Sequence, residues 1–321
     1  MHKKMSKKFT IVDAHEDIAF HLNYFKRSFV NPEVPCMITL PGLQEGNVKL
    51  VFNTIFVPPK QKPDSTLKSA MEQLATYEEL YRDCEQDIYR VLKPRDIENL
   101  DDNPRIGFLT LMEGADPIEE PSELNMFYNK GVRVIGLAWN DKNHYASGND
   151  TEDGLSEMGR ELVKRMNDLG VTLDLSHLNE RCFWDSIELT ELIPIATHSN
   201  ARTLTDHPRN LNDDQLRAIS KRGGVVGIVL YNLFLKTTEK VPTLEDVYAH
   251  TDYMIEIMGE DHVGIGSDMD GARIKDFPEG LKSIDKLQSI AEFFIAKGYS
   301  ESRVKKIMSG NFLRVMGKNL R

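Results

Sequence analysis

The stretch FTIVDAHEDIAFHL, residues 9–22, joins an apolar run directly to a cluster of polar side chains. Phe9–Val12 is apolar and β-branched, a pattern typical of a buried strand. The next five residues, Asp13 to Asp17, contain three carboxylates and an imidazole. Charged groups are costly to bury unless a partner compensates them. This stretch therefore predicts a buried strand that ends beside a compensating group.

The same organisation recurs along the chain, where eight apolar, strand-like runs alternate with helix-like segments. Short strands that are apolar on both faces are typical of parallel sheets, and eight βα alternations predict an α/β fold, a closed (β/α)8 barrel of the TIM type. A doubly wound open sheet is the alternative. The expected strands are Phe9–Val12, Val48–Val57, Arg105–Met112, Val132–Ala138, Val171–Asp174, Ile193–Thr197, Gly224–Leu230 and His262–Ile265.

The helix-like segments carry recognisable ends. Ser156 and Asn212 are expected N-cap residues. The helix that begins after Ser156 is expected to end at Gly170, and the helix that begins after Asn212 is expected to end at Gly223. Neither a linker-like tract nor an internal repeat divides the chain, so we expect residues 1–321 to form a single domain. The expected helices are Leu67–Leu92, Gly154–Gly170, Asn179–Thr190, Asn212–Gly223, Thr243–Gly259 and two C-terminal helices separated at Gly298.

Composition limits the classes of function. Of the 321 residues, 40% are hydrophobic and 28% are charged, as in ordinary globular domains. The formal net charge of −10, without a basic stripe, argues against a nucleic-acid partner. The basic start MHKKMSKK, residues 1–8, is expected to be a flexible, solvated tail. No apolar signal core or membrane-spanning run follows, so we expect a cytoplasmic protein without a membrane partner.

Five of the eight expected strands end in an acidic or metal-capable side chain. In a barrel, the carboxyl ends of the strands form the rim on which active sites are built. Taken singly, each of these residues is more readily explained as a helix cap or a hydrogen-bonding group. Taken together, they predict ligands gathered around cations, which answers the need for a partner at the first strand. The residues are His15 with Asp17, Glu113, His177, His198 and Asp268.

The ligand types predict the metal. Imidazoles with carboxylates and no paired cysteines favour Zn²⁺, with Mn²⁺, Co²⁺ or Fe²⁺ as alternatives. Because a mononuclear catalytic zinc usually keeps three protein ligands, the larger set predicts two cations. We expect the first to be held by His15 and Asp17, the second by His177 and His198, and Glu113 to bridge them.

Asp268 is not needed as a ligand in this arrangement. We expect it to be a catalytic residue that takes a proton from a water shared by the two metals and passes it to a leaving amine.

These residues lie in motifs through which the chain resembles the membrane (renal) dipeptidase family, a branch of the amidohydrolase-type metallopeptidases. The resemblance covers nearly the whole length. It implies a binuclear zinc dipeptidase with the metal ligands and proton-handling Asp268 given above, often tolerant of a D-residue at the carboxyl end of the dipeptide. It also suits a homodimer. The motifs are DAHED, MEG, GLSEMGRELVKRMNDLGVTLDLSH, ATHSNARTLTDHPRNLNDDQLRAISKRGGVVGI, HVGIGSDMDG and GNFLRV.

The resemblance implies two further substrate contacts. Arg209, in DHPRN, matches the arginine that holds the substrate carboxylate, for which a guanidinium fork is well suited. After the fourth strand, mammalian members carry a His thought to touch the scissile carbonyl, whereas this chain has Trp139, as many bacterial members do. An indole N–H can donate a hydrogen bond but cannot accept a proton. We expect Trp139 either to contact substrate or to pack, and substrate preference to differ accordingly.

The expected function is a metal-dependent dipeptidase, and two alternatives remain open. One is another amidohydrolase-type activity, on cyclic amides or lactones, against which stand Arg209 and the absence of a His-x-His start. The other is a barrel that binds metal without catalysis, against which stands the intact ligand set with Asp268. The sequence leaves the preferred dipeptide, its stereochemistry, the native metal and the oligomeric state undetermined.

Overall fold

The computed structural model describes residues 8–58, 63–238 and 240–321, so residues 1–7 of the expected basic tail lie outside the described residues. All eight expected strands are present, with ends that shift by up to four residues. Their bounds are β1 (Ile11–Glu16), β2 (Val48–Phe56), β4 (Ile106–Glu113), β5 (Val132–Gly136), β6 (Thr172–Asp174), β7 (Ile195–Ala196), β8 (Val225–Ile228) and β9 (Val263–Ile265).

These eight strands close into a barrel. Each pairs in parallel with its neighbours in the order β1-β2-β4-β5-β6-β7-β8-β9, and β9 pairs back with β1 through Ile265 and Asp13. The expected (β/α)8 barrel is therefore confirmed, and the alternative of an open doubly wound sheet is wrong. Closure places the carboxyl ends of all eight strands on one rim.

The segment expected to be one helix, Leu67–Leu92, is a helix followed by a strand. Helix α3 (Pro63–Asp83) ends early, and a short strand, β3 (Ile88–Arg90), pairs with the first residues of β4. The expectation of a continuous helix is wrong because β-branched and aromatic residues at the end of the segment suit an extended edge better than another helical turn. β5 pairs with β4 only from Thr110 onward, so β3 lies outside the closed barrel.

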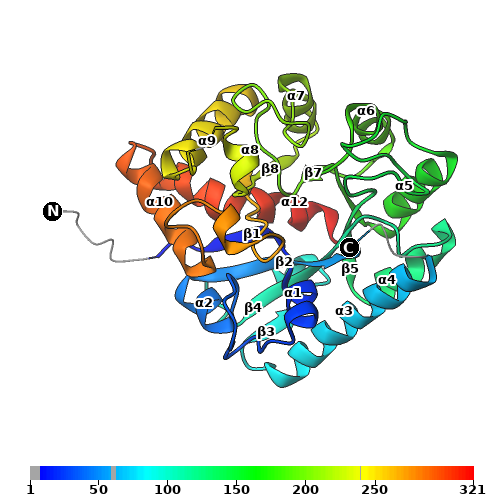
Figure 1. The fold of residues 1–321 in the computed structure, drawn as a ribbon, viewed down its shortest axis with the longest axis horizontal. Coiled ribbons are helices and arrows are strands. Elements are labelled where there is room, and N and C mark those ends of the chain that lie inside the picture. Colours follow the sequence, from blue (N-terminus) through cyan, green and yellow to red (C-terminus); the bar gives the residue numbers. More distant parts are fainter. Residues whose placement is uncertain (1–7, 59–62, 239) are drawn as a thin grey trace.

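Helices surround the barrel (Figure 1). The expected caps are confirmed: Ser156 accepts from the Gly159 N–H and Asn212 from the Gln215 N–H, while Gly170 ends its helix with a φ of 78°. The remaining helices are α1 (Ile18–Phe25), α2 (Leu40–Glu45), α4 (Leu124–Asn129), α5 (Glu157–Leu169), α6 (Glu180–Leu189), α7 (Asp213–Lys221), α8 (Asn232–Leu235), α9 (Leu244–Met258), α10 (Leu287–Ala296), α11 (Glu301–Lys305) and α12 (Asn311–Asn319), with 3-10 turns at Pro94–Asp96, Pro121–Glu123, Ile274–Asp276 and Ile284–Lys286.

The C-terminal segment forms the expected pair of helices split at Gly298, although the second is irregular. A π-helical turn, Lys306–Gly310, joins α11 to α12. Helix α12 packs Phe312, Val315 and Met316 into the interior of the barrel. Figure 1 shows α12, in red, lying against the strands near the centre of the molecule. The interior side chains of the strands are Val12, Ala14, Leu50, Phe52, Leu109, Leu111, Val134, Ile195 and Val225.

Hydrogen bonds place α12 at the amino ends of the strands. Asn319 Nδ2 donates to the carbonyl of Ile193, at 2.8 Å, just before β7. Arg314 donates to the carbonyls of Gly223, at 2.8 Å, and Asp261, at 2.6 Å, just before β8 and β9. The helix therefore closes the end of the barrel opposite the rim of carboxyl ends.

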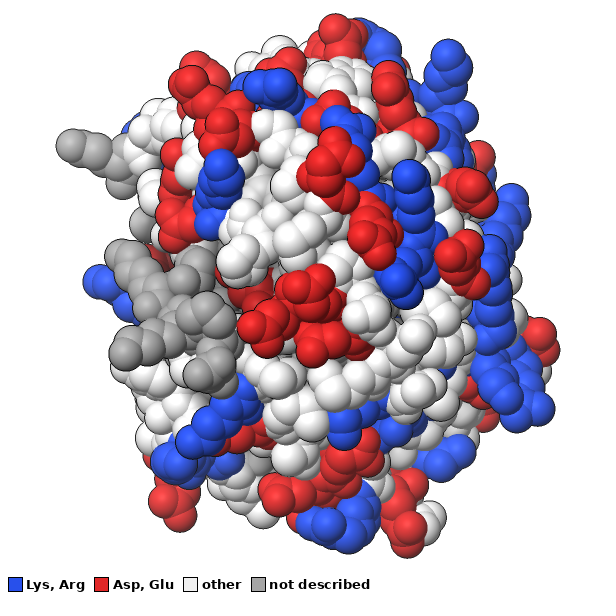
Figure 2. Space-filling view, turned by 90° about the vertical axis from the view of Figure 1, so that its right-hand side faces the viewer, with Lys and Arg blue, Asp and Glu red and all other residues white. Residues whose placement is uncertain are grey.

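Acidic and basic side chains are interspersed on the face formed by the right-hand side of Figure 1, with a group of acidic residues near its middle (Figure 2). Within the described residues, no helix combines the length and the apolar character needed to cross a bilayer. Cys36, Cys84 and Cys182 all carry free thiols.

Candidate active site

The strand ends bring three imidazoles around one carboxylate. Glu113 is the last residue of β4, and its Oε1 lies 3.5 Å from His15 Nε2, 2.8 Å from His177 Nε2 and 3.4 Å from His198 Nε2. His15 lies on β1, and the two other rings follow β6 and β7. Three histidines that are far apart in the sequence thus converge on one oxygen atom of Glu113.

Two further carboxylates stand on the His15 side of this cluster. Asp17 Oδ2 lies 3.6 Å from His15 Nε2, and Asp17 is also the N-cap residue immediately before α1. One ligand atom each from His15, Asp17 and Asp268 lies within 4.8 Å of the others. The structure therefore gathers all six residues expected at the rim, in two adjoining groups that share the region around Glu113.

The donor atoms are of the kinds that hold divalent metal ions. His15 Nε2 and Asp17 Oδ1 are buried without a hydrogen-bond partner within the described part of the chain. His177 Nε2 and His198 Nε2 lie 2.9 Å apart, and both face Glu113. Buried polar atoms are rarely left without partners. Nitrogen and carboxylate oxygen donors arranged in this way suit Zn²⁺ and its first-row neighbours.

The imidazoles of His177 and His198 are held in the neutral form that metal ligands require. Burial lowers the pKa of His177 to about 4, and the positive charge of Arg209 adds to this effect. Burial likewise lowers the pKa of His198 well below its usual value, with the neighbouring His15 adding to the effect.

The charges of His15 and Glu113 stabilise each other. Burial alone would lower the pKa of His15, but the carboxylates of Glu113 and Asp17 raise it well above its usual value. Burial alone would raise the pKa of Glu113, but His15 and His177 hold it well below its usual range. Glu113 is thus an ionised carboxylate at the centre of a buried cluster.

Asp268 occupies a strained position at the edge of the cluster. Its backbone φ is 64°, in the left-handed region, and its N–H donates to the carbonyl of His15 at 3.1 Å. The side chain is partly exposed. Desolvation, with the nearby charges of Asp17 and Glu113, raises the pKa of its carboxyl to about 8, although His15 and Arg209 oppose the shift. A carboxyl group with a raised pKa suits proton transfer near neutral pH.

Arg209 is buried beside the second group of ligands. Its Nη2 donates to the carbonyl of His198 at 3.0 Å, its Nη1 to Ser199 Oγ at 3.4 Å, and its guanidinium lies 5.3 Å from the ring centre of Phe234. Nε has no partner within the described residues. Burial lowers the pKa of Arg209 to about 10. Arg209 therefore remains positively charged, and its Nε–H group is available to donate a hydrogen bond to an anionic ligand.

Trp139 lies beside the ligands. Its ring centre is 5.9 Å from that of His177 and 5.3 Å from that of Phe56, which in turn lies 5.4 Å from Phe20. All three aromatic side chains are half-buried. The indole thus extends a row of partly exposed rings to the edge of the candidate site.

Three polar residues of the site escaped the sequence analysis. Asn140 Oδ1 lies 2.8 Å from His177 Nδ1, on the side of the ring that faces away from Glu113. Asp174 and Thr197 lie behind His198 and His15. All three follow or end a strand, the same signal that singles out the histidines, but short polar side chains at strand ends are common and gave no reason to choose them.

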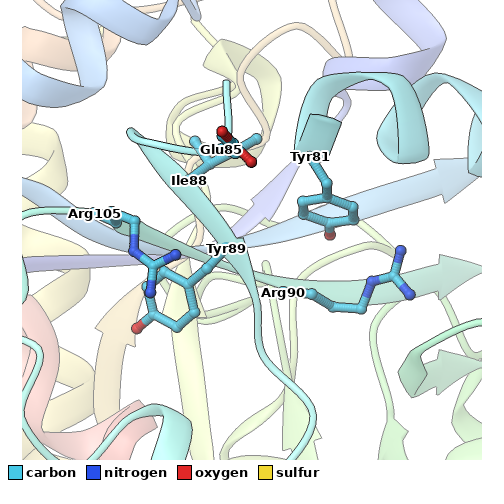
Figure 3. A pocket seen from close by; sticks show the side chains of 6 residues that line it. All are labelled: Tyr81, Glu85, Ile88, Tyr89, Arg90 and Arg105. Carbon is cyan, nitrogen blue, oxygen red and sulfur yellow. The ribbon is translucent and has the colours of Figure 1, made fainter. Parts of the chain in front are cut away.

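A separate hollow of about 300 Å³ is lined by side chains from α3, β3 and the start of β4 (Figure 3). Arg90 lies 4.6 Å from the ring centre of Tyr81, and Arg105 lies 5.1 Å from that of Tyr89. Because Arg105 precedes β4 whereas Glu113 ends it, this hollow lies at the other end of the barrel from the cluster. It contributes nothing to the candidate site.

Comparisons with known proteins agree with this geometry. The model of a family described as Membrane dipeptidase (Peptidase family M19) matches residues 1–320. An uncharacterized protein from the pqqA 5′ region of Klebsiella pneumoniae is 36% identical over 266 residues, which cover 79% of this chain and 97% of that protein. An uncharacterized dipeptidase of Schizosaccharomyces pombe is 29% identical over 343 aligned positions, covering 98% of this chain and 82% of that protein.

A solved structure shows the same likeness in three dimensions. The crystal structure of a metallopeptidase from Rhodobacter sphaeroides, liganded with a phosphinate mimic of the dipeptide L-Ala-D-Ala, matches with a TM-score of 0.92. The two sequences are 26% identical, and the match covers 98% of this chain and 100% of that one. The similarity therefore extends around the whole barrel.

Proposed function

Because the chain belongs to the membrane dipeptidase family of metallopeptidases, we propose that it hydrolyses the peptide bond of dipeptides at a site that holds two zinc ions. The observation that carries the proposal is the convergence of three imidazole nitrogens on one oxygen of Glu113. In this proposal His15 and Asp17 hold one ion, His177 and His198 hold the other, and Glu113 bridges them.

The bound ions would supply Lewis-acid chemistry, polarising the peptide carbonyl and bringing the pKa of a water molecule close to neutrality. The chain supplies the movement of protons. Asp268 accepts the proton that the attacking water loses and returns it to the amine that leaves. Its position within 4.8 Å of ligand atoms of His15 and Asp17 supports this role.

Arg209 is the proposed clamp for the carboxylate at the end of the dipeptide. Its guanidinium is buried next to His198, so a carboxylate bound there lies beside the metal ligands. A fixed cation one residue away from the reacting bond limits the substrate to two residues, since a longer peptide would carry an amide at that place. The same clamp contacts only the terminal carboxylate and supports tolerance of a D-residue there.

The phosphinate complex of the Rhodobacter sphaeroides relative mimics a dipeptide whose second residue has the D configuration. This likeness supports the proposed tolerance for this chain. Trp139, Phe56 and Phe20 would lie beside the first residue of the dipeptide, where their partly exposed rings favour an apolar side chain.

The test is a substrate panel combined with measurement of metal per chain. We expect two zinc ions per chain, hydrolysis of L,L and L,D dipeptides, and little turnover of tripeptides. A dipeptide amidated at its carboxyl end isolates the clamp, because it keeps the scissile bond and loses the anion. Turnover of dihydropyrimidines or lactones in preference to dipeptides would overturn the proposal, and so would a metal-replete protein with no hydrolytic activity.

A further inference from the structure

Asp174 and Thr197 form a hydrogen-bonded pair behind the candidate ligands. Asp174 ends β6, Thr197 follows β7, and both side chains are buried. Asp174 Oδ1 accepts from the backbone N–H groups of Ser176, at 3.0 Å, and Thr197, at 2.9 Å. Its Oδ2 accepts from the Thr197 hydroxyl at 2.6 Å. Both oxygen atoms of the Asp174 side chain thus act as hydrogen-bond acceptors.

The direction of these hydrogen bonds determines the direction of the hydrogen bond between Thr197 and His198. A carboxylate can only accept, so the single hydroxyl hydrogen of Thr197 must point to Asp174. The oxygen of the hydroxyl then has only lone pairs to offer His198 Nδ1, which lies 2.8 Å away. His198 Nδ1 must therefore carry the hydrogen. The Nε2 atom of the same ring, which faces Glu113 at 3.4 Å, keeps its lone pair for a cation.

The same hydroxyl also reaches the other group of ligands. Thr197 Oγ1 lies 3.4 Å from His15 Nδ1 and also 3.4 Å from Ser176 Oγ. The rings of His15 and His198 have centres only 3.8 Å apart. The hydroxyl oxygen of Thr197 thus lies beside the Nδ1 atom of one imidazole at each of the two proposed metal positions.

We propose that Asp174 and Thr197 are positioning residues that fix the tautomer and direction of His198, and secondarily of His15, so that one ligand of each metal presents Nε2 to the site. This inference rests on the proposed function only in taking these histidines as metal ligands. Polar groups that orient ligating histidines typically change metal affinity about 10- to 100-fold when they are removed.

The substitution Asp174→Asn tests the direction of the hydrogen bonds. The amide keeps Oδ1 as an acceptor for the two backbone N–H groups and places an N–H donor beside Thr197 Oγ1. The hydroxyl hydrogen is then free to turn to His198 Nδ1. We expect His198 to shift toward the Nε2–H tautomer, which is read from ¹⁵N chemical shifts of histidine in the full-length, metal-free protein, and zinc affinity to fall about 10- to 100-fold.

Two substitutions of Thr197 test the hydroxyl itself. Thr197→Val removes it at nearly constant volume and should weaken zinc binding by a similar factor, whereas Thr197→Ser retains it and should restore wild-type affinity. Thr251→Val is the matched control, because its buried hydroxyl donates only within α9, to Val247 at 2.8 Å. This control should bind zinc as the wild-type protein does.

The outcomes separate this inference from the proposed function, since neither readout uses a dipeptide. A wild-type protein with His198 in the Nε2–H tautomer, or an Asp174→Asn protein with unchanged tautomer and zinc affinity, would overturn the inference. Equal zinc affinities for Thr197→Val and wild type would do the same. A protein that shows the expected tautomers and affinities but cleaves no dipeptide would retain the inference and lose the proposed function.

Discussion

At the scale of single residues, the rim of the barrel contains non-glycine residues in the left-handed region of backbone conformation. His177 has a φ of 67°, Asp268 of 64° and Asp270 of 62°. A side chain costs about 1–2 kcal/mol in this conformation. Such strain persists where the surrounding structure imposes it, and it concentrates at functional sites. Two of these three residues are candidate members of the active site.

Asp268→Asn separates the proton-handling role of this residue from its backbone conformation. Asparagine adopts the left-handed conformation as readily as aspartate, so the fold and the zinc content should be retained. The amide cannot accept a proton from water, and we expect kcat for a dipeptide to fall about 100- to 10,000-fold. Steady-state kinetics with zinc analysis of the same sample make the measurement. Hydrolysis at the wild-type rate would show that Asp268 moves no proton.

His250 gives stability a dependence on pH away from the site. It is buried in α9, where Nδ1 accepts from the Ala201 N–H at 3.2 Å and Nε2 donates to the Leu235 carbonyl at 3.1 Å. Burial lowers the pKa of this ring to about 4. An unfolded chain protonates the ring near pH 6.5. Its contribution to stability is therefore complete above pH 6.5 and is lost as the pH falls toward 4.

We predict that the free energy of unfolding of wild type exceeds that of His250→Gln at pH 7, and that this difference shrinks by roughly 3 kcal/mol as the pH falls to 4. Urea unfolding at a series of pH values measures it. His144→Gln replaces an exposed ring and is the control for the loss of an imidazole outside α9. A constant difference for His250→Gln would contradict the neutral, buried assignment.

At the scale of elements, a glycine in the turn after β9 leaves room for two carboxylates of the site, one from this turn and one from the segment after β1. A Cβ atom added to Gly271 would lie 2.5 Å from Asp17 Oδ2 and even closer to Asp268 Oδ1. Side chains essentially never approach so closely, so either carboxylate would have to move. The glycine that ends SDMDG is thus required because any side chain at this position would displace the carboxylate of Asp17 or Asp268.

We predict that Gly271→Ala loses zinc from the His15–Asp17 side of the site and lowers kcat at least 10-fold, with a smaller effect on stability. Metal analysis and dipeptide kinetics on the same preparation provide the measurement. Gly310→Ala is the control, because a Cβ there makes ordinary contact, at 3.5 Å, with the carbonyl of Lys305. Full activity and zinc content in Gly271→Ala would mean that the two carboxylates tolerate displacement.

Elements are also where prediction from the sequence reaches its limit. The eight barrel strands are visible because each is apolar on both faces, and the caps at Ser156 and Asn212 are visible because they act locally. The sequence predicts a helix where strand β3 lies, because the pairing of β3 with β4 involves residues some 18 positions along the chain. The candidate ligands follow strands and so could be found. Asp174 and Thr197 could not, since their meaning depends on a contact between β6 and β7.

At the scale of the whole molecule, side chains of α12 fill the amino end of the barrel interior. Phe312 is buried, its ring centre lies 5.5 Å from that of Phe52, and the ring would collide with any side chain at Gly264. Removing a buried phenylalanine ring typically costs about 3–5 kcal/mol. The closure of the amino end therefore contributes to a cluster that contains side chains from six of the eight barrel strands.

We predict that Phe312→Ala lowers the free energy of unfolding by about 3–5 kcal/mol while the metal site, at the other end, keeps its zinc affinity in the folded protein. Gly317→Ala, on the same helix with nothing within 4 Å of the added Cβ, should be neutral or stabilising by about 0.5–1 kcal/mol. Denaturant unfolding and zinc titration provide the measurements. Unaltered stability of Phe312→Ala would show that the packing of α12 against the amino end of the barrel does not stabilise the protein.

The position of α12 in the sequence has a consequence for folding during synthesis on the ribosome. A ribosome makes every strand before it makes residues 311–319, so a nascent chain without α12 lacks the helix that closes the amino end of the barrel. The apolar side chains at that end are then exposed to water or to a chaperone. Termination before residue 311 should therefore yield an insoluble product, although every residue proposed to bind metal or substrate has already been synthesised.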